Sequence, residues 1–189
     1  DAQALIQVTR SVLHRLIGLG VFPSLLLTVL GQDLLLVFLG PKWDTAGVYV
    51  QILGIWMFFW FASWPLGTLA NIQNKQDTLL ILQGFLLVSR IASLAIGGWL
   101  GNDLLAISLF AGTGIVVYAA YAILCLRMID YPLRTSLPFL VRESLRAAAA
   151  AGCLAVIGWL LPIPSWGMVL LGGLSAGIYF LLVMRKNLI

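Results

Sequence analysis

The chain has 189 residues, of which 61% are hydrophobic and 10% are charged, and its mean hydropathy is +1.04. Because a soluble domain carries about a quarter charged residues, this composition excludes an ordinary soluble domain and indicates an integral membrane protein. The net charge of +4 does not indicate nucleic-acid binding, since basic residues in a membrane protein mostly mark the loops that stay in the cytoplasm.

Six apolar segments alternate with polar turns along the chain. They cover about residues 4–30, 46–70, 78–100, 104–126, 147–161 and 167–184. Roughly 20 apolar residues cross the hydrocarbon core as a helix, so we predict an all-α integral membrane domain of six transmembrane helices over residues 1–189. A short interfacial helix is predicted over residues 34–39 with Asp33 as its N-cap. Residues 127–146 are predicted to form a polar loop with a partly amphipathic helix.

Basic residues and tryptophans divide between the two sides of this predicted bundle. With the N-terminus inside, the inner segments hold Arg10, Arg15, Lys75, Arg127, Arg134, Arg142, Arg146, Arg185 and Lys186. The outer loops hold only Lys42, and the outer ends of the spans carry Trp43, Trp99, Trp159 and Trp166. The positive-inside rule and the aromatic belt therefore both predict that the two ends of the chain lie in the cytoplasm.

One permanent charge, Arg90, lies near the middle of the third span. A charge at the bilayer centre costs about 3 kcal/mol or more. Helical spacing places Arg90 on one stripe with Gln83, Leu87, Leu94 and Gly97, and Ser93 adjoins it. Such a stripe favours protein or a water-filled cavity over lipid. Arg90 either binds a phosphate or diphosphate through charge-assisted contacts, or bonds structurally to carbonyls or to a carboxylate of another span.

A ridge of aromatic residues lies on the second span, where Trp56, Trp60 and Trp64 recur every four residues. The ridge could stack against sugar rings or a polyprenyl chain. The commoner alternative is a ridge that faces lipid or packs within the bundle. Pro65 and Gly67 are expected to kink this span, as Pro23 is expected to bend the first.

The remaining polar and small residues are expected to have structural roles and not catalytic ones. The small-residue segment 173–177 is expected to pack closely against another helix. Cys125 and Cys153 are expected to pack as small apolar residues, and His14 is expected to be solvated. The carboxylates Asp33, Asp44, Asp77, Asp103, Asp130 and Glu143 are isolated in the sequence. We therefore expect no enzyme, because no catalytic pair is evident, and no metal site or cofactor.

Residues 38–47, FLGPKWDTAG, resemble the FG-x-x-W-x-x-A signature of polysaccharide-biosynthesis membrane proteins. The resemblance continues in residues 51–53 and 65–71 and in the polar turn 73–76. These proteins are the Wzx-type flippases of the MOP superfamily, whose relatives include the MATE drug exporters. In that family two six-helix lobes surround a central cavity, and this chain resembles the C-terminal lobe. Leu39 departs from the family, which commonly has Phe there. The chain opens at Asp1 without a Met, which also suggests a piece of a longer protein.

The resemblance implies transport of an undecaprenyl-diphosphate-linked glycan across the bacterial inner membrane, for lipopolysaccharide or another surface polysaccharide. The expected substrate-binding residues are Arg90, Gln83, Ser93 and Trp60. The expected partners are the lipid-linked oligosaccharide, membrane lipids and a missing N-terminal lobe, with no nucleic acid. Two alternatives remain open, a MATE-like multidrug or cation antiporter and a membrane scaffold that transports nothing. A scaffold would tolerate the substitution Arg90→Gln, whereas a phosphate-binding flippase would not.

Overall fold

The computed structural model describes residues 2–161 and 163–187, with side chains through residue 183. Helices make up nearly all of these residues, and they contain no strand. The helices are α1 (Ala2–Leu39), η1 (Pro41–Trp43), α2 (Asp44–Ser63), η2 (Trp64–Leu66), α3 (Gly67–Ile72), α4 (Gln76–Trp99), α5 (Asp103–Arg127), α6 (Leu133–Leu160) and α7 (Ser165–Asn187). The prediction of an all-α chain is confirmed for the described residues.

Five helical segments are long and apolar enough to cross a membrane, one fewer than predicted. They are Ala2–Leu39, Pro41–Ile72, Gln76–Trp99, Asp103–Arg127 and Ser165–Val183. α4 and α5 begin and end within two residues of the predicted spans. Their shared turn is sharp because Gly101 has a φ of +61°. The side chain of Asn102 then caps α5 by accepting a hydrogen bond from the amide of Leu105 at 2.9 Å.

The predicted fifth span is the second half of α6, which is not among the five segments. The loop predicted over residues 127–146 is limited to residues 128–132, and the helix predicted within it is the first part of α6, which begins at Leu133 and includes Pro138. Its polar half packs against α1, where the ring of His14 stacks on Phe139 with centroids 4.2 Å apart. The apolar half, Ala147–Leu160, rises about 21 Å, which is short of the roughly 30 Å of a hydrocarbon core.

The first helix is continuous through residues 31–33, so the separate interfacial helix with Asp33 as N-cap is wrong. Contacts with α2 explain the continuity, because Gln32 donates a hydrogen bond from Nε2 to Oδ1 of Asp44 at 2.7 Å. Gln32 therefore has a polar partner without any break in α1. The helix ends at Leu39, before Gly40, whose φ of +90° few other residues adopt.

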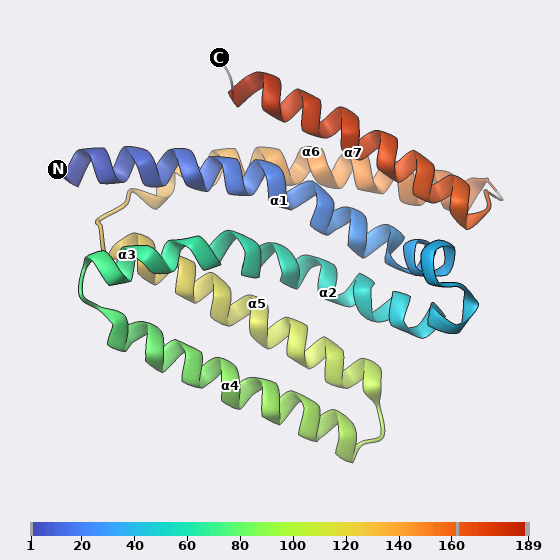
Figure 1. Cartoon of the computed structure of the whole chain (residues 1–189), viewed down its shortest axis with the longest axis horizontal. Coiled ribbons are helices and arrows are strands. Elements are labelled where there is room, and N and C mark those ends of the chain that lie inside the picture. Colours follow the sequence, from blue (N-terminus) through green and yellow to red (C-terminus); the bar gives the residue numbers. More distant parts are fainter. Residues whose placement is uncertain (1, 162, 188–189) are drawn as a thin grey trace.

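The second span is helical throughout but interrupted at Pro65, as the sequence predicted. The 3-10 turn η2 contains Pro65 and separates α2 from α3. Proline has no amide hydrogen to donate and its ring clashes with the preceding turn, which accounts for the interruption. Pro23 lies inside α1, and Figure 1 shows that α1 changes direction partway along its length.

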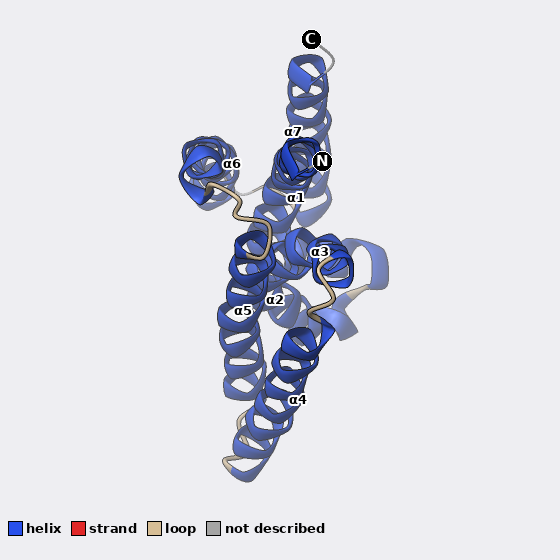
Figure 2. Cartoon of the chain, turned by 90° about the vertical axis from the view of Figure 1, so that its left-hand side faces the viewer, coloured by secondary structure: helices blue, strands red, loops and turns tan. Residues whose placement is uncertain are grey.

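The helices form an open row and not a closed bundle (Figures 1 and 2). α1 packs against α2, α6 and α7, while α5 lies between α2 and α4. α4 therefore forms one edge of the row, held mainly by α5. The start of α1 and the end of α7 both lie toward the left of Figure 1. The helix ends that carry the exposed tryptophans Trp43, Trp99, Trp159 and Trp166 lie toward the right.

The close packing predicted for residues 173–177 is absent at the two glycines of that segment. Gly173 and Gly177 are exposed, and no atom lies within 4 Å of where a Cβ would stand on either. Gly54 instead lies directly against α1, and Gly97 against Ala106 of α5. Small residues thus bring α2 onto α1 and α4 onto α5. Cys125 is buried, as predicted, whereas Cys153 is exposed.

Candidate binding site around Arg90

α4 places Arg90 on the side of the helix that faces α5. The buried residues of α4 are Leu86, Ser93 and Gly97, which recur at helical spacing and mark this face. Arg90 lies between them in the sequence and is half-buried. Because Gly97 has no side chain, the backbones of α4 and α5 approach closely, and the guanidinium group reaches across to α5.

Two neutral side chains of α5 hold the guanidinium group. Nη2 of Arg90 donates a hydrogen bond to the hydroxyl oxygen of Tyr118 at 3.1 Å. The central carbon of the guanidinium lies 5.2 Å from the ring centroid of Phe110, within the range of a cation–π interaction. The hydroxyl of Ser63 in α2 donates a hydrogen bond to the backbone carbonyl of Tyr118 at 2.9 Å, which links α2 to α5 at this residue. α2, α4 and α5 therefore meet around this one cation.

No carboxylate neutralises Arg90 within the described part of the chain. The salt bridges there join Arg142 and Arg146 to Glu143, all in α6. A tyrosine hydroxyl and an aromatic face stabilise a guanidinium group but leave its formal charge uncompensated. Arg90 thus combines a position in the middle of an apolar helix with a positive charge that only neutral groups contact.

The tryptophan ridge of α2 begins at this cation. The ring of Trp56 lies 5.5 Å from that of Phe110 and 6.3 Å from that of Tyr118, centroid to centroid. Trp60 stacks on Trp56 at 6.3 Å with an interplanar angle of 11°, and Trp64 follows at 6.4 Å. Trp60 is 38% exposed and Trp64 is 60% exposed. The ridge therefore extends from the buried contacts of Arg90 to the surface of α2.

The predicted site residues separate into two groups. Arg90 and Trp60 belong to one aromatic cluster, joined through Trp56. Ser93 is 3% exposed and donates its hydroxyl to the carbonyl of Ser89 at 2.7 Å, within its own helix. Gln83 is exposed, two helical turns from Arg90.

Sequence reasoning missed the residues that hold the guanidinium. Phe110, Gly114 and Tyr118 recur every four residues along α5 and therefore share one face. Gly114 lies under the indole of Trp56, where a Cβ would clash with the ring. Two aromatic residues flanking a glycine at this spacing, in a helix whose one other aromatic residue is Tyr121, are the signal that could have identified the α5 side of the site.

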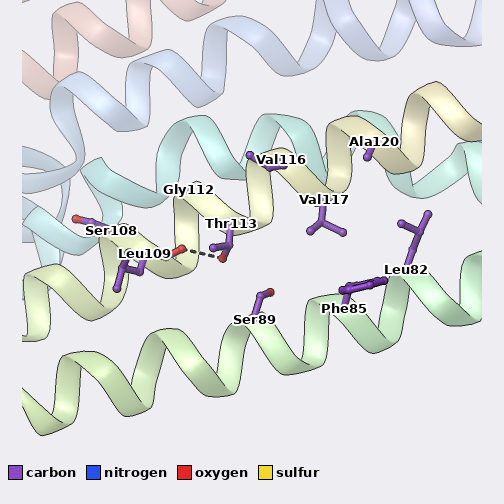
Figure 3. A pocket seen from close by; sticks show the side chains of 10 residues that line it. All are labelled: Leu82, Phe85, Ser89, Ser108, Leu109, Gly112, Thr113, Val116, Val117 and Ala120. Carbon is purple, nitrogen blue, oxygen red and sulfur yellow. Dashed lines mark hydrogen bonds between the residues drawn. The ribbon is translucent and has the colours of Figure 1, made fainter.

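A separate groove lies on the other flank of α4 and α5 (Figure 3). Its volume is about 540 Å³, and Leu82, Phe85, Ser89, Ser108, Leu109, Gly112, Thr113, Val116, Val117 and Ala120 line it. Figure 3 shows Ser89 and Thr113 facing one another across it, and the hydroxyl of Thr113 donates to the carbonyl of Leu109 at 2.7 Å. The groove is thus apolar and does not include Arg90.

Replacing Tyr118 with phenylalanine removes the hydrogen bond to Arg90 and keeps the aromatic ring. We expect a loss of about 1 kcal/mol in unfolding free energy, as for other interhelical hydrogen bonds in membranes. Thermal unfolding in detergent measures the loss. In an Arg90→Met background the same substitution should cost almost nothing, because the bond is already gone. Equal losses in both backgrounds would show that the hydrogen bond does not stabilise the fold.

Comparisons of the chain with protein-family models, with curated proteins and with solved structures found no match. The resemblance to Wzx-type flippases therefore rests on residues 38–77 of the sequence alone, and membership of that family stays a prediction.

Proposed function

We propose that this chain is one lobe of a lipid-linked oligosaccharide flippase, in which Arg90 binds the diphosphate of a polyprenyl carrier. The observation that carries the proposal is the uncompensated charge of Arg90 in the middle of α4. A cation inside a membrane segment requires an anionic or strongly polar partner. Only neutral side chains contact Arg90 among the described residues, so an anion supplied by a substrate would complete the site.

The geometry suits a diphosphate. A guanidinium group has five N–H donors, and the bond to Tyr118 uses one of them. The remaining donors can form paired, charge-assisted bonds to phosphate oxygens. Tyr118 and Phe110 hold the group in place, which lowers the entropic cost of binding. The exposed faces of Trp60 and Trp64 are available to sugar rings or to the start of a polyprenyl chain, and Gln83 offers a further hydrogen-bonding group.

The open row of helices also supports a lobe that requires a partner. α4 packs on α5 and leaves much of its apolar surface uncovered. In the proposed assembly, a first lobe packs over the row next to the exposed rings of Trp60 and Trp64 and closes a cavity around the half-buried Arg90. The protein lies in the bacterial inner membrane with both ends of this segment in the cytoplasm, and rocking of the two lobes moves the head-group to the outer leaflet. The protein performs transport without catalysis.

The test replaces Arg90 with glutamine or lysine in the protein expressed in its host. We expect Arg90→Gln to abolish surface glycan and to leave the lipid-linked precursor on the inner leaflet. Arg90→Lys should be partly active, because lysine keeps the charge and loses the planar fork. Immunoblots of the membrane fraction establish that each variant is made at normal levels.

The matched control is Lys42→Gln, which removes an exposed charge at a helix end and should leave the glycan unchanged. Normal glycan in the Arg90→Gln strain would contradict the proposal and favour a scaffold. Normal glycan after deletion of the whole gene, with increased sensitivity to toxic cations, would favour a MATE-like antiporter.

A further inference from the structure

A crevice of about 830 Å³ lies between α6 and α7, away from Arg90. Both helices pack mainly on α1 and touch one another little, and Figure 2 shows α6, seen end-on, standing apart from α7. One part of the crevice is charged and carries Arg142, Glu143 and Arg146, while its apolar walls include Ala150, Ile178 and Leu182. It therefore combines a polar end with an apolar channel.

The charged end is built around a buried carboxylate. Glu143 is 5% exposed, and its Oε1 lies 2.7 Å from Nη1 of Arg146 and 3.4 Å from Nε of Arg142. The side chains of the two arginines remain 45% and 55% exposed, so most of their N–H donors stay free. The hydroxyl of Tyr179 is buried beside Glu143 without a hydrogen bond of standard geometry. Two arginines and one glutamate leave a net charge of +1.

The positions of Arg142 and Arg146 along α6 place the cluster on the side of the bilayer opposite Leu160, toward the lipid phosphates. At 1.5 Å per residue, Arg146 lies about 21 Å and Arg142 about 27 Å from Leu160, the last residue of α6. With Leu160 at one edge of a hydrocarbon core about 30 Å thick, Arg142 lies about 3 Å and Arg146 about 9 Å inside the other edge. Long arginine side chains reach the interface from such positions. The apolar walls of the crevice continue from there toward the bilayer centre.

We propose that the crevice between α6 and α7 binds an anionic phospholipid, with its phosphate on Arg142 and Arg146 and one acyl chain between the helices. The single negative charge of a phosphodiester balances the net charge of the cluster. Glu143 pairs with both guanidinium groups and sets the net charge of the cluster, while the two arginines make the contacts to the phosphate. This site is independent of Arg90 and of the proposed transport function.

The test is native mass spectrometry of the full chain, purified in detergent and titrated with phosphatidylglycerol or phosphatidylcholine. The wild type should retain phosphatidylglycerol in preference to phosphatidylcholine. The triple variant Arg142→Gln/Glu143→Gln/Arg146→Gln leaves no buried charge behind and should bind phosphatidylglycerol about tenfold more weakly. Glu143→Gln alone keeps both arginines and should retain the lipid.

Two further variants separate charge at the crevice from general charge and from misfolding. Arg134→Gln removes a positive charge from the same helix outside the crevice and should bind like the wild type. Ala150→Phe fills the apolar channel, keeps every charge and should also weaken binding. Circular dichroism confirms that each variant has the helix content of the wild type. Equal binding by the triple variant and by Glu143→Gln would overturn the proposal, as would full displacement of the lipid by soluble glycerol phosphate.

Discussion

Replacing Gly54 with valine should lower the thermal midpoint of unfolding by roughly 6–12 °C, which corresponds to a loss of about 3 kcal/mol. Gly54 lies where α2 crosses α1. A Cβ there would stand 2.7 Å from the carbonyl oxygen of Ser24 and 2.8 Å from the amide nitrogen of Thr28, both backbone atoms of α1. Backbone atoms cannot avoid the clash by changing rotamer as a side chain can, so α1 and α2 must move apart. Thermal unfolding of the purified chain in detergent measures the effect.

The matched control is the same substitution at Gly84 in α4. No atom lies within 4 Å of the position of its Cβ, so valine meets open space and also relieves the entropic cost of a helical glycine. Gly84→Val should leave the midpoint unchanged or raise it slightly. Similar midpoints for the two variants would contradict the close crossing of α1 and α2.

Replacing Glu143 with alanine should destabilise the chain by about 2 kcal/mol. Breaking a buried ion pair costs about 3–5 kcal/mol when the remaining charge stays buried. The loss is smaller here because solvent reaches Arg142 and Arg146, whose side chains are 55% and 45% exposed. The expected fall in thermal midpoint is roughly 4–8 °C. Glu143→Gln should cost less, because the amide keeps the shape and one hydrogen-bond acceptor.

Asp77→Ala provides the comparison for Glu143. Asp77 is an exposed carboxylate in the first turn of α4, where it contributes only a favourable interaction with the helix dipole. Its removal should change the midpoint much less than Glu143→Ala does. An equal or larger effect at Asp77 would show that Glu143 is not the carboxylate on which the packing of α6 depends.

The site around Arg90 is assembled from three helices, α2, α4 and α5, and so depends on how they pack. Its guanidinium belongs to α4, its two contacts belong to α5, and the ring that packs on both contacts belongs to α2. Disturbing any of the three interfaces should therefore alter the surroundings of the cation. Gly114→Leu is an example, because it would displace the indole of Trp56 without touching Arg90 itself.

Hydropathy alone determined that this protein is helical and apolar enough for a membrane, and it located α4 and α5 to within two residues. Those features depend on local composition, because about 20 apolar residues bounded by polar turns suffice to define a span. Hydropathy also isolated Arg90 as the one charge within its span. The break at Pro65 was predictable for the same local reason.

Tertiary contacts decided the rest. α1 continues through Asp33, and its neighbour Gln32 bonds to Asp44 of α2. Residues 133–146 are helical where they pack on α1. The partners of Arg90 lie 20 and 28 residues away in the chain. The crevice beside Glu143 is formed by two helices that pack mainly on α1 and touch one another little. The local sequence determines whether each segment forms a helix. Which helix faces pack together depends on where small residues on two helices allow close approach, so it cannot be predicted from one segment alone.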